Sequence, residues 1–259
     1  FRRVLFRSDR GYLLHFYLCH MHGHRFEDER EYLELAIANR YRGVAIHATP
    51  HRPVDDDLFE RAAAEMRLAH VGFYGTELPQ QSFFLPDYRS AGASAVGYLL
   101  SRGCTRLHYV SSLPEGHHVN ELVLAGAEQA AAPLTETGPG RTFHCGSKLP
   151  EAADHRDGFD RLGKHCGLLI FSPRTAAWLE ETLNDPPPMV LITDRLQDRV
   201  KLRMPAYAFD WMGRVRDALN FIVSEETAQR HHLYPPTFLP GRPVAGEPSR
   251  PLPAVRSEC

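Results

Sequence analysis

The sequence has no excess of basic residues. Its 30 lysines and arginines are outnumbered by 32 aspartates and glutamates, which gives a formal net charge of -2 at pH 7 and a sequence pI near 6.8. Domains that bind nucleic acid present lysines and arginines clustered on one face. The chain has no such electrostatic footprint, so we expect any DNA-binding part to lie outside it.

Cysteine and long apolar runs are also scarce. The chain has five cysteines, an odd number, and they are widely spaced with no CxxC motif among them. They are Cys19, Cys104, Cys145, Cys166 and Cys259. This pattern fits a reducing compartment better than a disulfide framework. No apolar run approaches the roughly 20 residues of a membrane-spanning helix. We therefore expect a cytoplasmic protein with no membrane partner.

Motifs of catalysis and cofactor binding are missing. The glycine-rich residues 138–141 lack the Lys-Ser/Thr of a phosphate loop. Residues 92–97 approach a nucleophile elbow, but Gly97 falls one position late and Ser94 lies inside a helical stripe. We expect no enzyme, no catalytic residue and no cofactor.

Two clusters have alternative interpretations. His20, His22 and His24 would share one face of an extended segment and could ligate a metal, with Cys19 nearby as a fourth ligand. No acid or thiolate lies at a recognised ligand spacing, which favours surface histidines and no metal site. The acids at 55–57 could form a catalytic pair, but their place at a helix start favours caps.

The clearest positive pattern lies in residues 84–111. Asp87 precedes Ala91, Ala95 and Leu99, the i, i+4, i+8 stripe of a helix that buries one face, and Gly103 ends that helix. Residues 106–110 then form a strand. A strand, a helix and a second strand make the unit of a parallel sheet, whose ligands bind at the carboxyl ends of strands.

The same alternation extends along the chain, which is 43% hydrophobic and long enough for one large or two small domains. Strands are predicted over 11–19, 43–48, 71–74, 142–145, 167–171 and 189–193. Helices are predicted over 26–40, 55–66, 119–132, 158–162, 176–183 and 212–224. The tail at 235–253 is proline-rich, and 254–257 is a further strand candidate.

The 84–111 pattern resembles the core signature of one family, the lactose-repressor and galactose-repressor (LacI/GalR) type of bacterial transcription regulator. The matching residues are Asp87, Gly92, Ala93, Ala95, Leu99, Leu100, Gly103 and Arg106. A second stretch at 190–213 matches through Asp194, Pro205, Asp210, Trp211, Met212 and Gly213. The ending LPAVRSEC resembles the final strand of the family.

The resemblance implies the two-lobed α/β fold of type I periplasmic-binding proteins, each lobe a mainly parallel sheet flanked by helices. Residues 9–111 and 209–232 would form the N-terminal lobe, and 112–208 and 233–259 the C-terminal lobe. The helix-turn-helix of the family has no counterpart in the chain. Residues 1–8 match the translated end of a common sequencing adapter, so we interpret them as a sequencing or assembly scar and the chain as N-terminally truncated.

The resemblance also places the ligand site. Asp87 and Asp194 occupy effector-contact positions, facing each other from opposite lobes, and Ser172 stands where the family has an amide or acid. The simpler alternatives are a helix N-cap for Asp87 and a turn residue for Asp194. Val123 stands where the family commonly has an arginine and Pro173 where it has an acid, so we expect either an unusual ligand or a site that has lost its response to ligand.

The implied function is the effector-binding and dimerisation domain of a repressor that senses a small polar ligand such as a sugar. The ligand would shift lobe closure, and operator DNA would be bound only through the missing N-terminal domain. The alternative is an extracytoplasmic sugar-binding protein of an ABC transporter, which an upstream signal peptide would favour.

We predict that this chain alone does not bind DNA specifically, because it has neither a recognition helix nor a basic face. Mobility-shift titrations at physiological salt should show no shift with any duplex. Saturable, sequence-dependent binding would contradict this prediction.

Overall fold

The chain folds as two compact units, each built from two chain segments. The computed structural model describes residues 4–7, 13–16, 26–46, 56–72, 81–113, 116–132, 140–144, 165–183, 185–194, 203–225, 228 and 230–241. Unit 1 comprises Phe1–Leu85 and Met212–Leu233, and unit 2 comprises Pro86–Trp211 and Tyr234–Cys259. Among the described helices, none has the length and apolarity needed to span a membrane.

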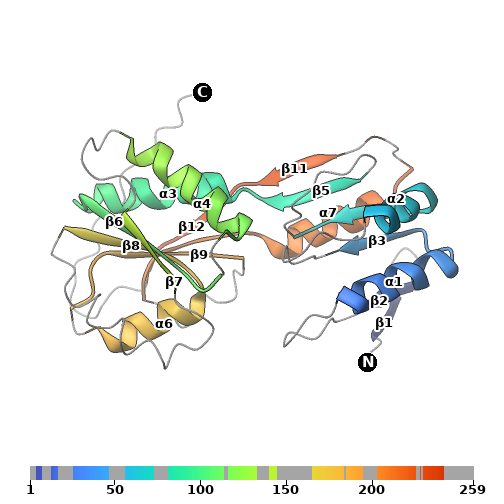
Figure 1. Ribbon diagram of the computed structural model, residues 1–259, viewed down its shortest axis with the longest axis horizontal. Helices are drawn as coiled ribbons and strands as arrows, with labels where there is room; N and C mark the ends of the chain where they lie inside the picture. The colour runs from blue at the N-terminus through green and yellow to red at the C-terminus, as the bar shows by residue number, and fades with distance from the viewer. Residues whose placement is uncertain are drawn as a thin grey trace. The chain divides into compact units, whose positions relative to one another are not determined.

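Unit 1 contains a four-stranded sheet in the order β11-β5-β4-β3 (Figure 1). Its strands are β3 (Gly43–Ile46), β4 (Arg67–His70), β5 (Ser82–Pro86) and β11 (His231–Tyr234). The pairs β3–β4 and β4–β5 are parallel. The helices of this unit are α1 (Phe26–Ala38), α2 (Asp56–Glu65) and α7 (Trp211–Val223).

Two neighbouring aromatic residues of β5 show how unit 1 buries both faces of its sheet. Phe83 packs into the cluster formed with side chains of α1 and α2, among them Leu33 and Phe59. The ring of Phe84 lies 6.1 Å from that of Phe221 on α7. Successive side chains of a strand point to opposite faces, so α7 covers the face of β5 opposite to α1 and α2.

Two arginines bind the carboxyl end of α7. Arg42 donates from Nε to the Ile222 carbonyl at 3.3 Å and from Nη2 to the Ser224 carbonyl at 3.1 Å. Arg67 donates from Nη1 to the Phe221 carbonyl at 2.7 Å. The last carbonyls of a helix lack partners within the helix and carry partial negative charge. The guanidinium groups supply the missing hydrogen-bond donors and balance the partial negative charge. They also attach the end of α7 to the amino-terminal side of β3 and β4.

The first strands form a separate two-stranded sheet. Strand β1 (Val4–Arg7) pairs antiparallel with β2 (Leu13–Phe16), with Val4 opposite Phe16. Residues 4–7 belong to the segment that we interpreted as a sequencing or assembly scar and excluded from the fold, whereas in the structure they form a paired strand. The origin of residues 1–8 stays a prediction.

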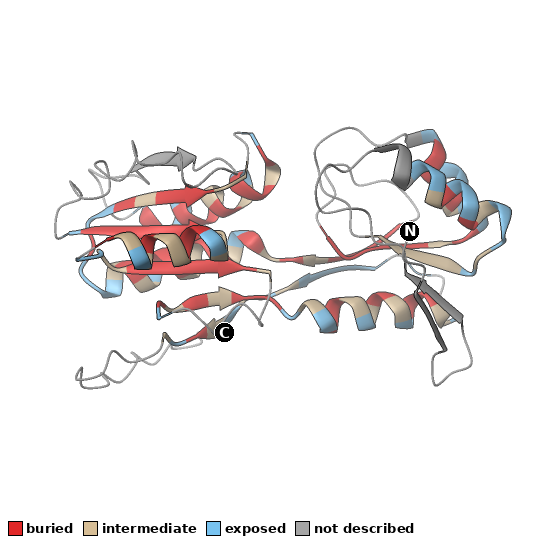
Figure 2. Cartoon of the chain, turned by 90° about the horizontal axis from the view of Figure 1, so that it is seen from below, coloured by how far each residue is buried: buried red, intermediate tan, exposed pale blue. Residues whose placement is uncertain are grey.

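Unit 2 contains a six-stranded sheet in the order β12-β10-β9-β8-β6-β7. These strands are β6 (Arg106–Ser111), β7 (Gly140–His144), β8 (Cys166–Phe171), β9 (Met189–Thr193), β10 (Ala206–Ala208) and β12 (Thr237–Leu239). Only β12 runs antiparallel to its neighbour. Strands β8 and β9 are buried almost along their full lengths, as the red strands of Figure 2 show.

Helices cover both faces of this sheet (Figure 1). Helix α6 (Pro173–Thr182) packs on β8 and β9 from one side, and α3 (Tyr88–Ser101) packs on the same strands from the other. Helix α4 (His118–Ala131) lies against α3. Strands buried on both faces read as continuous apolar runs, which is how residues 167–171 and 189–193 were recognised as strands.

Helices α3 and α4 touch backbone to backbone. A Cβ atom at Gly92 would lie 2.1 Å from the carbonyl oxygen of Val123, and one at Gly126 would lie 1.9 Å from that of Arg89. Neither position can carry a side chain unless the helices separate. The two glycines therefore set the distance between α3 and α4.

The expected lobe boundary at Ser111 is wrong. Residues 9–111 were assigned to one lobe, but unit 2 begins at Pro86. The reason is that β6 pairs with β7 and β8, with Arg106 opposite Cys166, and so belongs to the six-stranded sheet. A strand–helix–strand pattern does not reveal that its two strands, here β5 and β6, lie in different sheets. The later crossings fall at Trp211/Met212 and Leu233/Tyr234.

Several short strands also differ from the prediction. Strand β4 occupies Arg67–His70 rather than 71–74, and β10, β11 and β12 were not predicted. Strand β12 lies within the proline-rich tail, where its pairing with β10 overrides the local composition. The predicted helix at 158–162 and strand at 254–257 lie outside the described residues.

The α3–α4 contact predicts opposite effects for two glycines of α3. Gly92→Ala should lower the free energy of unfolding by about 2 kcal/mol, because overpacking forces the helices apart. Gly97→Ala should raise it by up to about 1 kcal/mol, because Gly97 is exposed, no atom lies within 4 Å of its added Cβ, and alanine favours helix. Urea unfolding of both variants measures the difference. Equal changes in the free energy of unfolding in the two variants would contradict the close backbone contact between α3 and α4.

His70 makes the stability of unit 1 dependent on pH. It ends β4, is 1% exposed, bonds to Gln81 and stacks on Phe83 with ring centroids 5.0 Å apart. Burial lowers the pKa of its imidazole from 6.5 to about 4, against the smaller opposing effect of the Gln81 hydrogen bond. The unfolded chain therefore binds a proton in the window between pH 6.5 and 4 that the folded chain does not.

We predict that the contribution of His70 to stability is complete above pH 6.5 and is lost as the pH falls towards 4. The full loss is at most about 3 kcal/mol. Urea unfolding at pH 7, 6 and 5 gives the free energy of unfolding at each pH. This free energy should fall less steeply with falling pH in His70→Gln than in the wild type, and exposed His232→Gln is the control. The same dependence on pH in His70→Gln and the wild type would exclude His70 as the cause.

Candidate functional site

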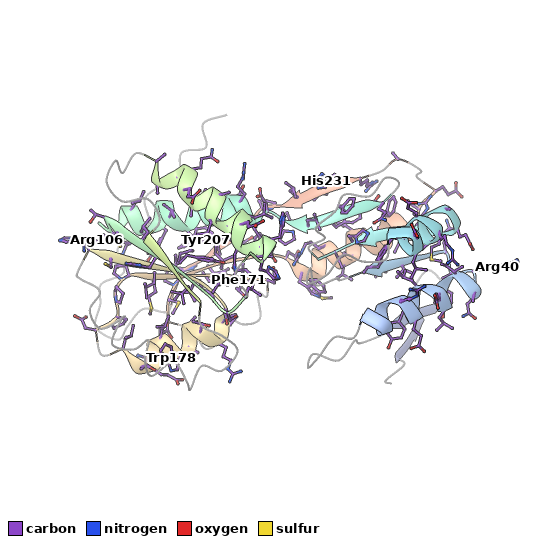
Figure 3. The ribbon with its side chains drawn as sticks, viewed as in Figure 1. Arg40, Arg106, Phe171, Trp178, Tyr207 and His231 are labelled. Atoms are coloured by element: carbon purple, nitrogen blue, oxygen red, sulfur yellow. The ribbon has the colours of Figure 1, made fainter. Side chains whose placement is uncertain are left out.

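Polar side chains gather at the carboxyl edge of the six-stranded sheet. Ser172 follows β8 and Asp194 follows β9. These strands pair in parallel with Phe171 opposite Ile192, so both side chains lie at the same edge of unit 2. Figure 3 labels Phe171 near this edge and Arg106 near the opposite one. Ligands of parallel α/β sheets bind at the carboxyl edge.

Tyr88 connects this edge to α3. Its hydroxyl donates a hydrogen bond to Asp194 Oδ1 at 2.7 Å. Its ring packs edge-on against Phe171, at 5.8 Å between centroids, and against Phe209, at 5.2 Å. The side chain is 3% exposed, while Asp194 is half-buried. The Asp194 carboxylate is thus held by a buried donor, on a residue that is itself only partly buried.

Asp87 caps α3 from the preceding position. Its Oδ1 accepts from the Ser90 backbone N–H at 2.9 Å, and its Oδ2 accepts from the Ser90 hydroxyl at 2.5 Å. This is the N-cap geometry that the sequence offered as an alternative. The capped first turn holds the adjacent Tyr88, so Asp87 supports the site. A contact between Asp87 and a ligand stays a prediction.

The expected opposition of Asp87 and Asp194 across two lobes is wrong. Both belong to unit 2, because the crossing occurs at Leu85/Pro86 and not after β6. Asp87 caps α3 on one face of the sheet, and Asp194 directly follows a central strand of that sheet. They are linked through Tyr88, which follows one and donates to the other.

Ser172 begins α6 on the opposite face. Its hydroxyl accepts from the Thr175 N–H at 3.3 Å, and Pro173 occupies the first helical position. Proline is favoured there because the N–H it lacks has no helical partner. The residue that replaces the acid of the family thus serves the helix start, and Ser172 remains at the edge beside β9.

Val123, which the resemblance sets where the family often has an arginine, packs inside unit 2. It lies on α4, is fully buried, and its backbone carbonyl oxygen makes the close contact with Gly92. The other described polar groups near the start of α4 bond within unit 2: Asn120 accepts from the Tyr109 hydroxyl at 2.8 Å, and burial raises the pKa of that phenol. This part of α4 contributes packing.

The metal and catalytic alternatives receive no support from the part of the chain that the structure describes. It holds no group of three or more potential metal-ligating His, Cys, Asp or Glu side chains. His20, His22, His24 and Cys19 lie outside the described residues. Of the acids at 55–57, Asp57 is exposed in the first turn of α2, as expected for a solvated helix start.

Tyr88 was not predicted as a site residue from the sequence. The available indications were its aromatic ring directly after the Asp87 cap and the aromatic residues at strand ends, Phe171 as the last residue of β8 and Phe209 directly after β10. Such residues usually belong to the core, and Phe209 is fully buried while Phe171 is partly buried. Only the positions of β8, β9 and β10 as neighbours bring the three aromatic residues together with Asp194.

No family model and no curated protein matches the chain, but solved structures do. A LacI transcriptional regulator from Lactobacillus brevis is 10% identical with a TM-score of 0.65, over 82% of this chain and 84% of that one. The Cra regulator from Pseudomonas putida, solved with fructose 1-phosphate, is 17% identical with a TM-score of 0.64, over 84% of each chain.

A solute-binding protein of an ABC transporter from Burkholderia graminis, solved with D-arabinose, is equally similar in fold. It is 13% identical with a TM-score of 0.65, over 84% of this chain and 83% of that one. The expected fold class, the type I periplasmic-binding-protein-like α/β fold, is therefore confirmed. The structures that share it include regulators of the family whose signature residues 84–111 resemble.

Proposed function

We propose that this chain is the effector-binding domain of a bacterial transcription regulator, a repressor of the LacI/GalR type that senses a small polar ligand such as a sugar. It acts by binding and not by catalysis. It forms a homodimer in the cytoplasm, and operator DNA is bound through a separate helix-turn-helix domain of the full-length protein. Allosteric coupling transmits ligand binding to that domain.

The observation that carries the ligand-binding part of the proposal is the position of Asp194. Its half-buried carboxylate lies at the carboxyl edge of a parallel sheet and is held by the Tyr88 hydroxyl. A carboxylate accepts hydrogen bonds in about four directions, which suits the hydroxyl groups of a sugar. Ser172, which directly follows the neighbouring strand β8, adds a hydroxyl that can donate or accept.

The cysteines favour a regulator over a transporter component. Cys104 and Cys166 are both free thiols buried in unit 2, 3% and 2% exposed. Free thiols persist in a reducing cytosol, whereas oxidising compartments favour disulfides. A solute-binding protein remains the second candidate because one shares the fold. The solved relatives bind fructose 1-phosphate and D-arabinose, which makes these two sugars natural first probes.

The site predicts a loss of sugar affinity on changing its carboxylates. Asp194→Ala should weaken the binding of the best sugar in a panel containing D-arabinose, D-xylose and fructose 1-phosphate by about 1 to 3 kcal/mol, because a ligand hydroxyl loses its acceptor. Asp87→Ala should weaken it by a similar amount, here through loss of the α3 cap that supports Tyr88. Isothermal titration calorimetry measures both, with His22→Ala as the unaffected control.

Unchanged affinity in both aspartate variants would remove these residues from the site. The regulatory part of the proposal is tested separately with the full-length gene product. Its affinity for the DNA upstream of its own gene should change when the best sugar is added. DNA binding that is absent with and without sugar would favour the solute-binding alternative.

A further inference from the structure

Tyr88 contacts residues at the ends of three adjacent strands at the carboxyl edge of the sheet of unit 2. Phe171 ends β8, Asp194 follows β9 and Phe209 follows β10, and these strands are neighbours in the order β10-β9-β8. The Tyr88 ring packs between the two phenylalanines, and its hydroxyl reaches the carboxylate that follows the strand between them. The ring is held on both sides, so the direction of the hydroxyl is fixed.

We propose that Tyr88 is a positioning residue of the ligand site, which holds the Asp194 carboxylate in the orientation that accepts ligand hydroxyl groups. This inference rests on the proposed function. Tyr88 orients the acceptor and does not itself contact the ligand. A side chain whose rotamer is locked before binding loses less conformational entropy when the ligand arrives.

The backbone of α3 fixes Tyr88 from the other end. Asp87 caps the helix one residue earlier, through Ser90. The carbonyl of Arg89, one residue later, lies against Gly126 of α4, where an added Cβ would be only 1.9 Å away. The residues on both sides of Tyr88 are therefore held, by a cap and by a backbone contact between helices. The phenol extends from a rigid point to Asp194.

A purely structural role would be limited to filling space between Phe171 and Phe209. Phenylalanine fills that space equally well but has no hydroxyl, so Tyr88→Phe separates the two roles. Tyr98 offers a matched control on the same helix. It is half-buried and packs against Phe238 with ring centroids 5.7 Å apart, away from the strand ends that hold Asp194.

The test is a double-mutant cycle in sugar binding. Wild type, Tyr88→Phe, Asp194→Ala and the double variant are titrated by calorimetry with the tightest-binding sugar of the panel D-arabinose, D-xylose and fructose 1-phosphate. Tyr88→Phe should weaken binding up to about 10-fold, because the ligand must then immobilise an Asp194 side chain that is no longer held. The same change in the Asp194→Ala background should weaken it less than 2-fold, because Tyr88 acts through the carboxylate and alanine leaves no acceptor for its hydroxyl. Tyr98→Phe should bind like the wild type.

Each outcome decides the proposal. Wild-type affinity in Tyr88→Phe, or an equal loss in both backgrounds, overturns the positioning role and leaves the proposed function intact. Failure of the wild type to bind any sugar of the panel overturns the proposed function and this inference with it. A crystal structure of Tyr88→Phe provides a test without ligand: the Asp194 carboxylate should leave its present orientation, and an unchanged orientation overturns the proposal.

Discussion

The close contact between α3 and α4 is the constraint on which the site in unit 2 depends. Gly92 and Gly126 each meet a carbonyl oxygen of the opposite helix at a distance that excludes any side chain. The contact fixes the first turn of α3, because the carbonyl that meets Gly126 belongs to Arg89. Tyr88 precedes it, and its hydroxyl bonds to Asp194 at the carboxyl edge of the sheet. A packing restriction between two helices thus holds the first turn of α3, from which Tyr88 reaches Asp194.

The chemistry of the site follows from the order of strands. A parallel sheet brings the ends of β8, β9 and β10 to one edge, and each of these ends contributes one side chain to the site. Phe171 and Phe209 hold the ring of Tyr88, and Asp194 between them offers a polar acceptor. In the proposed function, such an edge suits a small ligand rich in hydroxyl groups, because the recognition of hydroxyl groups needs fixed acceptors. The solved relatives with bound sugars share this fold.

The sequence predicted the elements of the fold better than their association. The stripe of Ala91, Ala95 and Leu99 is buried as expected, and Gly103 ends α3 with a φ of +82°. Buried strands such as β9 were found because apolar runs of this length are typical of sheets covered on both faces. The unit boundary was misplaced because local patterns do not encode which sheet a strand joins. Short strands such as β12 depend on pairing partners distant in the chain. The role of Tyr88 could not be predicted, since it arises from three strand ends that only the tertiary fold brings together.

The central claim is that Asp194, held by Tyr88, is the acceptor for ligand hydroxyl groups at the carboxyl edge of unit 2. The most direct measurement is a crystal structure of the protein with the tightest-binding sugar. The account predicts a sugar hydroxyl within hydrogen-bonding distance of the Asp194 carboxylate, about 2.7 Å away, with the Tyr88 bond retained. A sugar bound elsewhere, with no sugar hydroxyl near the Asp194 carboxylate, would contradict it.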